Sequence, residues 1–186
     1  MLRAVLGARR RTVSTAVAEA AGRMVAAQIL TAPEIEAAVC VGLYASLPDE
    51  VSTRVCFESL RRLGCECLFP RMAEGGRMVF ARVGAWDQLA PGRFGVLEPP
   101  AREAAVVPGA GDLVLVPGVA FDLRGHRLGR GAGSYDAAFP PGAAEPPLLF
   151  GVAYEFQVLE SLPYGSRDRR MDAIVTERTI RRVQGA

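Results

Sequence analysis

The chain has 186 residues, 50% of them hydrophobic, and a formal net charge of +2. This length is enough for one substantial α/β domain and short for two. The small net charge gives no broad argument for nucleic-acid binding, and the aromatic residues do not alternate with a basic run, as they do in single-strand binders. No apolar run approaches the roughly 20 residues that cross a bilayer. We expect a protein that binds neither nucleic acid nor membranes.

The four cysteines show no spacing that is typical of a metal site or a redox motif. Cys40, Cys56, Cys65 and Cys67 lack the C-x-x-C pattern. Free thiols in a reducing cytoplasm are therefore expected rather than a disulfide framework. This places the protein in the cytoplasm.

The first thirty residues allow two interpretations. Residues 1–11 are basic and contain no acid, which is also typical of a mitochondrial transit peptide. Against that reading, apolar residues from Leu2 to Met24 recur at roughly helical spacing, and Ser14 can restart a helix near Arg11. We favour an opening helix of the mature domain.

Short apolar runs, rich in β-branched residues, predict buried strands. They lie at residues 39–43, 66–69, 113–116, 148–153 and 173–176, with a weaker strand at 78–82. Helices are expected over 50–63, 134–139 and 156–161. Strands that alternate with helices predict a three-layer α/β/α fold with a mostly parallel central sheet.

The segment from Tyr44 to Glu50 follows the strand at 39–43. It is therefore expected at the carboxyl end of a strand, where open α/β sheets bind ligands. From spacing alone, Glu50 is best explained as a negative charge in the first turn of the next helix.

The most informative stretch is residues 122–136, which reads DLRGHRLGRGAGSYD and follows the strand at 113–116. Three glycines stand at alternate positions; Arg127 precedes the first of them, and Arg130 lies between the first two. Glycine lets backbone N–H groups approach an oxyanion closely, and guanidinium groups supply charge and bidentate geometry for phosphate. Asp136 ends the stretch, where a carboxylate can hold a metal ion against the phosphates. The pattern predicts a nucleotide triphosphate site.

Two commoner phosphate motifs do not fit this stretch. The dinucleotide fingerprint would need glycine at Ser134, and the Walker motif needs a lysine, which the chain lacks. A glycine-rich surface hairpin with solvated arginines would explain the three glycines taken alone.

The complete string, D-x-x-G-x-R-L-G-x-G-x-G-x-Y-D, resembles the 5-formyltetrahydrofolate cyclo-ligase family, also called methenyltetrahydrofolate synthetases. Weaker matches follow in the same order along the chain, at Arg3, Tyr44–Val51, Phe69–Arg71, Glu98–Pro99, Gly151–Tyr154 and Asp168. The resemblance implies one domain over residues 1–186.

The implied activity is an ATP- and Mg²⁺-dependent ligase reaction. It converts 5-formyltetrahydrofolate to 5,10-methenyltetrahydrofolate and releases ADP and phosphate. Small molecules, ATP and a reduced folate, are then the expected partners of a monomer. The alternative is a non-catalytic or weakly active nucleotide- or folate-binding member of the same fold.

The resemblance also implies roles for individual residues. ATP is expected at Arg3, Arg127, Leu128, Gly129, Arg130, Gly131, Ala132, Gly133, Ser134 and Tyr135. The folate is expected at Ala45, Glu50, Phe94 and Tyr135, and Mg²⁺ at Asp136 and Asp168. Arg130 and Tyr135 are expected to act in the reaction itself.

The chain departs from the family pattern at several positions on the phosphate side. Ser134 replaces the first of two aromatic residues, Ala132 stands where lysine or glycine is common, and Ala137 replaces an arginine. The lysine that pairs with Arg3 in the family would fall before Met1. Because both acids and both loop arginines remain, a slow enzyme is expected rather than an inactive one.

Overall fold

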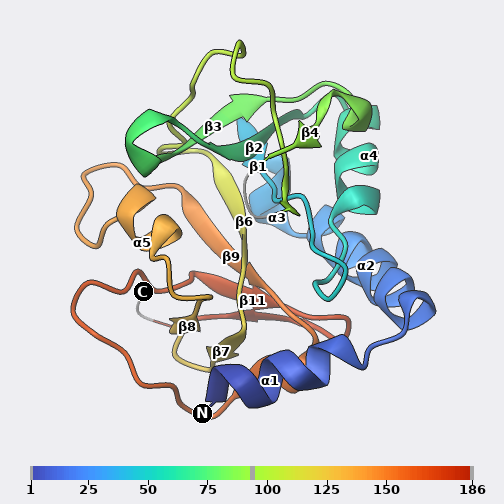
Figure 1. The fold of residues 1–186 in the computed structure, drawn as a ribbon, viewed down its shortest axis with the longest axis vertical. Helices are drawn as coiled ribbons and strands as arrows, with labels where there is room; N and C mark the ends of the chain where they lie inside the picture. Colours follow the sequence, from blue (N-terminus) through green and yellow to red (C-terminus); the bar gives the residue numbers. More distant parts are fainter. Residues whose placement is uncertain (1, 93–94, 185–186) are drawn as a thin grey trace.

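A computed structural model describes residues 2–92 and 95–184 (Figure 1). Its centre is a seven-stranded sheet in the order β12-β11-β9-β6-β1-β2-β3. These strands are β1 (Cys40–Gly42), β2 (Glu66–Met72), β3 (Met78–Arg82), β6 (Leu113–Pro117), β9 (Leu148–Val152), β11 (Ala173–Val175) and β12 (Ile180–Arg182). Only the two edge strands, β3 and β12, run antiparallel to their neighbours. The prediction of a mostly parallel sheet is confirmed.

Helices cover both faces of the sheet, so the predicted three-layer α/β fold is confirmed. The helices are α1 (Leu2–Arg11), α2 (Thr15–Leu30), α3 (Pro33–Glu36), α4 (Arg54–Arg62) and α5 (Ser134–Ala138). The α2 and α4 helices pack on one side of the sheet and α5 lies on the other (Figure 1). Within the described ranges, no helix has the length and apolar character needed to cross a membrane.

The break between α1 and α2 occurs where the sequence predicts it. Ser14 is the N-cap of α2, and its hydroxyl accepts a hydrogen bond from the backbone N–H of Val17 at 3.4 Å. Such a cap satisfies one of the free N–H groups of the first turn. The opening segment is therefore helical from Leu2 onward, as expected for part of the folded domain.

The central strand β6 shows how the two sides of the core form. Successive side chains of a strand point to opposite faces. Leu113 and Leu115 accordingly pack with α2 and α4, whereas Val114 and Val116 pack with Phe139, which follows α5. All four of these side chains are fully buried. A strand buried on both faces explains the uninterrupted apolar run in the sequence.

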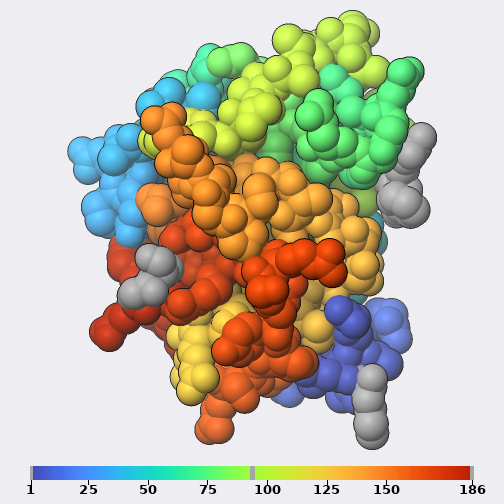
Figure 2. Space-filling model, turned by 90° about the vertical axis from the view of Figure 1, so that its left-hand side faces the viewer, coloured from blue at the N-terminus to red at the C-terminus, as the bar shows by residue number. Residues whose placement is uncertain are grey.

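Two small sheets complete the fold. One contains β10 (Val158–Leu159), β7 (Ala120–Asp122) and β8 (Arg127–Leu128), and the other pairs β4 (Ala90–Pro91) with β5 (Leu97–Glu98). The chain between β10 and β11 passes beside the segment that contains α5. Figure 2 shows these two segments, coloured red-orange and orange, against one another, and the N–H of Arg169 donates to Asp136 there.

The predicted start of the helix at Glu50 is wrong. The α4 helix begins at Arg54, with Thr53 as its N-cap residue. The segment before it is held in a non-helical path by Tyr44, whose hydroxyl donates to the Val51 carbonyl at 2.9 Å. The Thr53 hydroxyl in turn donates to the Tyr44 carbonyl. These two hydrogen bonds from side-chain hydroxyls to backbone carbonyls override local helix propensity, and they leave Glu50 outside the helix.

The predicted helix from Phe156 to Ser161 is also wrong. The chain forms one 3₁₀ turn over Glu155–Gln157 and then strand β10, which pairs in parallel with β7. The buried side chain of Gln157 fixes this path, because its amide donates to the carbonyls of Gly118 and Val119 at 3.0 and 2.9 Å. Gly118 and Val119 lie 39 and 38 residues away from Gln157 in the sequence, so no local pattern predicts these contacts.

Gly151 provides a test of how tightly the central sheet packs. A Cβ atom at this position of β9 would lie 2.4 Å from the ring of Phe121. Gly151→Ala should therefore lower the free energy of unfolding by about 1–3 kcal/mol, the usual cost of overpacking a core. Urea unfolding monitored by circular dichroism measures it. Gly84→Ala is the matched control, because its nearest neighbour is 3.6 Å away. Equal stability of the two variants would contradict this packing.

Candidate active site

The site lies where the order of the parallel strands changes direction. From β1 the chain continues outward to β2 on one side, whereas β6, β9 and β11 follow one another on the other side. In open α/β sheets, ligands bind at such a switch point, beyond the carboxyl ends of the strands. Here Tyr44 and Ala45 follow β1, and Gly118 follows β6. All three line one cavity of about 610 Å³.

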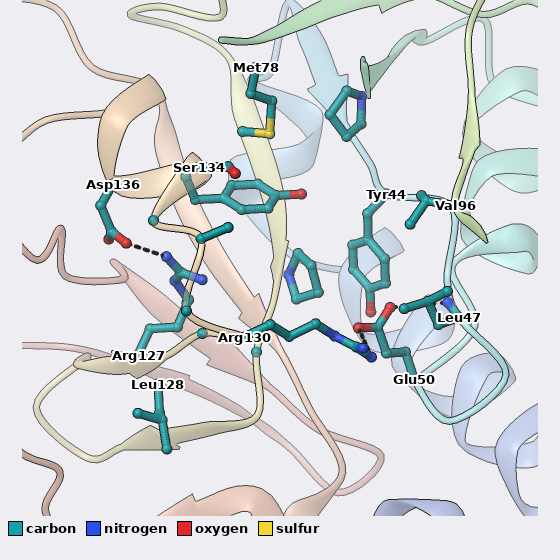
Figure 3. Close-up of a pocket in the computed structure, with 18 of the residues that line it drawn as sticks. Tyr44, Leu47, Glu50, Met78, Val96, Arg127, Leu128, Arg130, Ser134 and Asp136 are labelled. Atoms are coloured by element: carbon teal, nitrogen blue, oxygen red, sulfur yellow. Dashed lines mark hydrogen bonds and ion pairs between the residues drawn. The ribbon is translucent and has the colours of Figure 1, made fainter. Parts of the chain in front are cut away.

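This cavity brings together the candidate residues that the sequence places far apart (Figure 3). Its lining includes Arg3, Ala45, Glu50, all ten residues from Arg127 to Asp136, and Asp168. Phe94, the remaining candidate, lies outside the described residues. Convergence on one cavity is what a ligand site requires. The individual roles of these residues remain predictions.

The glycine-rich loop joins β8 to α5 and forms one wall of the cavity. Gly131 and Gly133 adopt φ values of 111° and 66°. Residues with a Cβ atom rarely adopt such backbone angles. At both positions, the space around a Cβ atom would be open. The glycines are thus required by the backbone path rather than by close packing, and the path leaves the loop accessible to a ligand.

Arg127 and Asp136 form an ion pair at the two ends of this loop. A guanidinium nitrogen of Arg127 lies 2.8 Å from a carboxylate oxygen of Asp136, and the Arg127 side chain is only 6% exposed. Its guanidinium carbon also lies 5.4 Å from the ring centre of Tyr135. The pair therefore fixes the orientation of the carboxylate and holds a buried positive charge beside the loop.

Asp168 reaches the same cavity from the segment between β10 and β11. Its carboxylate accepts the N–H of Gly165 at 2.8 Å, and the neighbouring Arg169 N–H donates to Asp136 at 3.3 Å. Over residues 2–92 and 95–184, no cluster of three or more potential protein ligands for a metal is present. Mg²⁺ needs only one or two carboxylates when substrate phosphate and water complete its shell. Asp136 and Asp168 both line the cavity, and their carboxylate oxygens are of the ligand type that such an ion takes.

Arg130 connects the glycine-rich loop to the opposite wall. Its guanidinium lies 3.1 Å from a Glu50 carboxylate oxygen and 3.2 Å from an Asp49 carboxylate oxygen. Figure 3 shows the side chain extending toward Glu50, away from the Arg127–Asp136 pair. Glu50 also accepts the N–H of Leu47 at 3.1 Å. Its position is thus set by cavity contacts and not by a helix terminus.

Arg10 was not predicted as a site residue, although its buried side chain holds Asp49, the neighbour of Glu50, in place. Arg10 is 2% exposed, and its guanidinium lies 2.5 Å from Asp49 and donates to the Gly118 carbonyl at 3.1 Å. Burial alone would raise the pKa of Asp49, but the hydrogen bond and charge of Arg10, together with Arg130, hold that pKa below its ordinary value. Arg10 stands between two other arginines, so the sequence carried no signal that distinguished it.

Three tyrosines near the cavity are poor candidates for a base at neutral pH. Burial raises the pKa of Tyr44 and of Tyr135 above the ordinary value, and it raises the pKa of Tyr154 to about 12. Phenol groups with a raised pKa keep their proton. Tyr135, which the cavity exposes to a ligand, is therefore suited to packing and to hydrogen-bond donation.

Fold and cavity together define an α/β protein with an arginine- and glycine-rich ligand site at the switch point of its sheet. Comparison with known proteins makes this more specific. The model of the 5-formyltetrahydrofolate cyclo-ligase family matches residues 1–177. The chain belongs to this family, and it is an enzyme of the ligase class.

Individual relatives agree with the family match over almost the whole chain. The 5-formyltetrahydrofolate cyclo-ligase of Escherichia coli is 29% identical over 171 residues, which cover 90% of this chain and 94% of the relative. The mouse protein of that name is 26% identical, covering 95% and 92%. The NMR structure of Aquifex aeolicus 5,10-methenyltetrahydrofolate synthetase has a TM-score of 0.85 and 33% identity, covering 100% of this chain and 92% of that one.

Proposed function

We propose that this protein, acting as a single domain, uses ATP and Mg²⁺ to convert 5-formyltetrahydrofolate to 5,10-methenyltetrahydrofolate. The family match and the names of the relatives support the reaction. The observation that carries the proposal is Arg130, whose guanidinium links the glycine-rich loop to Glu50 within 3.1 Å. A phosphate site and a folate site on these two walls would meet at this arginine.

The chemistry explains why a nucleotide is needed. The formyl oxygen is an amide oxygen and a poor leaving group. Transfer of the terminal phosphoryl group of ATP to this oxygen gives a phosphate ester and ADP. N10 then attacks the formyl carbon, phosphate leaves with the former formyl oxygen, and the N10 proton passes to solvent. The protein's contribution is positioning and stabilisation of charge.

Each wall of the cavity has a part in this scheme. Arg127 and the glycine-loop amides would hold phosphate oxygens, and Arg130 would face the transferred group. Glu50 would accept N–H donors from the pterin edge, against Tyr135. Asp136 and Asp168 would hold Mg²⁺, which neutralises phosphate charge when it is bound.

The proposal is tested by mixing the purified protein with ATP, Mg²⁺ and 5-formyltetrahydrofolate and following methenyltetrahydrofolate absorbance. A rise that requires all three additions is expected. Thermal unfolding with each ligand is measured in parallel to show that the sample is folded and binds. Stabilisation by the ligands without any turnover would identify a binding protein and overturn the enzymatic proposal.

Ser134 offers a gain-of-function test, because it replaces an aromatic residue of the family pattern and lines the cavity. Ser134→Tyr should restore one aromatic contact with a substrate, worth about 1 kcal/mol, or roughly a fivefold lower KM. Steady-state kinetics with each substrate varied in turn measures it. Ala144→Tyr is the control, since this exposed residue is not part of the cavity lining. An unchanged or higher KM for both substrates in Ser134→Tyr would contradict the expectation.

A further inference from the structure

Arg71 is a cavity residue whose positive charge has no counterpart. It lies near the carboxyl end of β2, next to β1 in the sheet, and it lines the same cavity as the glycine-rich loop. One guanidinium nitrogen donates to the Glu103 carbonyl at 3.1 Å. The Nε atom is buried and has no hydrogen-bond acceptor, and no carboxylate of the described residues forms an ion pair with Arg71.

The Nε atom of Arg127 is likewise buried without an acceptor, but both loop arginines of the cavity differ from Arg71 in having a carboxylate partner. Arg127 is paired with Asp136, and Arg130 is paired with Asp49 and Glu50. A guanidinium that is largely withdrawn from water without an anionic partner is costly. The carboxylate of Glu98, which also lines the cavity, accepts the Met72 N–H at 3.4 Å and leaves Arg71 unpaired. An oxyanion of a bound ligand would complete the site.

The surroundings of Arg71 indicate which oxyanion this is. The neighbouring wall is apolar, with Met72, Met78 and Val96 in the cavity lining. Val96 and Asp136 lie on opposite sides of the cavity in Figure 3, and Met78 lies above Ser134 between them, so the Val96 end of this wall is the part remote from the carboxylate proposed to hold the metal against the phosphates. An aromatic ring followed by a carboxylate matches an apolar surface that ends in a guanidinium.

We propose that Arg71 binds a carboxylate of the glutamate portion of the reduced folate, whose benzoyl ring packs against Met72, Met78 and Val96. This inference rests on the proposed function, because it assumes that the cavity takes a folate. It makes Arg71 a residue that recognises the glutamate end of the substrate. Arg71 distinguishes folates that carry the glutamate from pteroates that lack it.

The test compares two ligands that differ only in the glutamate, 5-formyltetrahydrofolate and 5-formyltetrahydropteroate. Their dissociation constants are measured by calorimetry for the wild-type protein, Arg71→Met and Arg71→Lys. The wild type should bind the intact folate about 10- to 100-fold more tightly, the scale of a hydrogen-bonded charge pair. Arg71→Met should lose this preference by weakening folate binding alone, and Arg71→Lys should recover part of it.

Arg77→Met is the matched control, because this exposed arginine of the same β2–β3 connection lies outside the cavity lining. It should keep the wild-type preference. A wild-type protein that binds both ligands equally would overturn the inference without any variant. If Arg71→Met weakens the binding of both ligands equally, Arg71 has a structural role. If it raises only the KM for ATP, Arg71 binds phosphate. A wild-type protein that binds neither ligand would instead contradict the proposed function.

Discussion

Replacing Asp136 by asparagine is expected to lower the turnover rate by about 100-fold or more, the scale found when one group that stabilises reaction charge is removed. The carboxylate has two proposed tasks. It would hold Mg²⁺ with Asp168, and it orients Arg127 through the 2.8 Å ion pair. Asparagine keeps the shape of the side chain but removes its charge. The rate should be measured over a range of Mg²⁺ concentrations.

The dependence on Mg²⁺ separates these two tasks. If Asp136 holds the metal, the concentration of Mg²⁺ that gives half-maximal turnover rises in Asp136→Asn. If it serves only to orient Arg127, the KM for ATP rises while the Mg²⁺ dependence stays unchanged. Asp87→Asn, an exposed replacement in the 3₁₀ turn Trp86–Gln88, controls for the loss of one negative charge. A wild-type rate in Asp136→Asn at all Mg²⁺ concentrations would contradict both roles.

Arg10→Met should reduce both stability and activity, because Arg10 supports the Glu50 wall from a buried position. The variant leaves Asp49 without its 2.5 Å partner and removes one of the two side-chain donors to the Gly118 carbonyl, the other being Gln157. We expect a loss of about 2–3 kcal/mol, below the roughly 3–5 kcal/mol for a fully buried pair, because Arg130 still contacts Asp49. Urea unfolding measures the free energy.

Two further variants make this prediction specific. Arg11→Met changes the adjacent arginine of the same helix, which is exposed, and should cost little. Asp49→Asn in the Arg10→Met background removes the uncompensated charge and should recover part of the lost stability. A loss of stability in the double variant that equals or exceeds the sum of the losses in the two single variants would show that Arg10 and Asp49 do not stabilise one another.

The sheet was largely predictable from the sequence because its parallel strands are buried on both faces. Residues 113–116 form a continuous apolar run, and the structure places them in β6 at the centre of the sheet. The errors in the predicted helices lie where hydrogen bonds to residues outside the segment decide its backbone conformation. Tyr44 holds residues 51–53 out of a helix, and Gln157 binds carbonyls that lie 38 and 39 residues away.

The residues of the candidate site likewise divide into those that a local sequence pattern predicts and those that only the fold brings together. The glycine-rich loop is contiguous, so its glycines and arginines suggested an anion site. The glycine spacing taken alone also fitted a surface hairpin, and the resemblance of the complete string to the family decided between the two and added Glu50 and Asp168. Their gathering around one cavity depends on the switch point between β1 and β6, which no local pattern encodes. Arg10 and Arg71 have ordinary sequence contexts. Only burial and the presence or absence of a partner distinguish them from the solvated arginines.

The central claim is that the formyl oxygen receives the phosphoryl group of ATP before the ring closes. It is tested by supplying 5-formyltetrahydrofolate labelled with a heavy oxygen isotope in the formyl group, together with ATP and Mg²⁺. The inorganic phosphate is then isolated and analysed by mass spectrometry. The account predicts that the label appears in phosphate, one atom for each methenyltetrahydrofolate formed. Label found in water, with unlabelled phosphate, would contradict it.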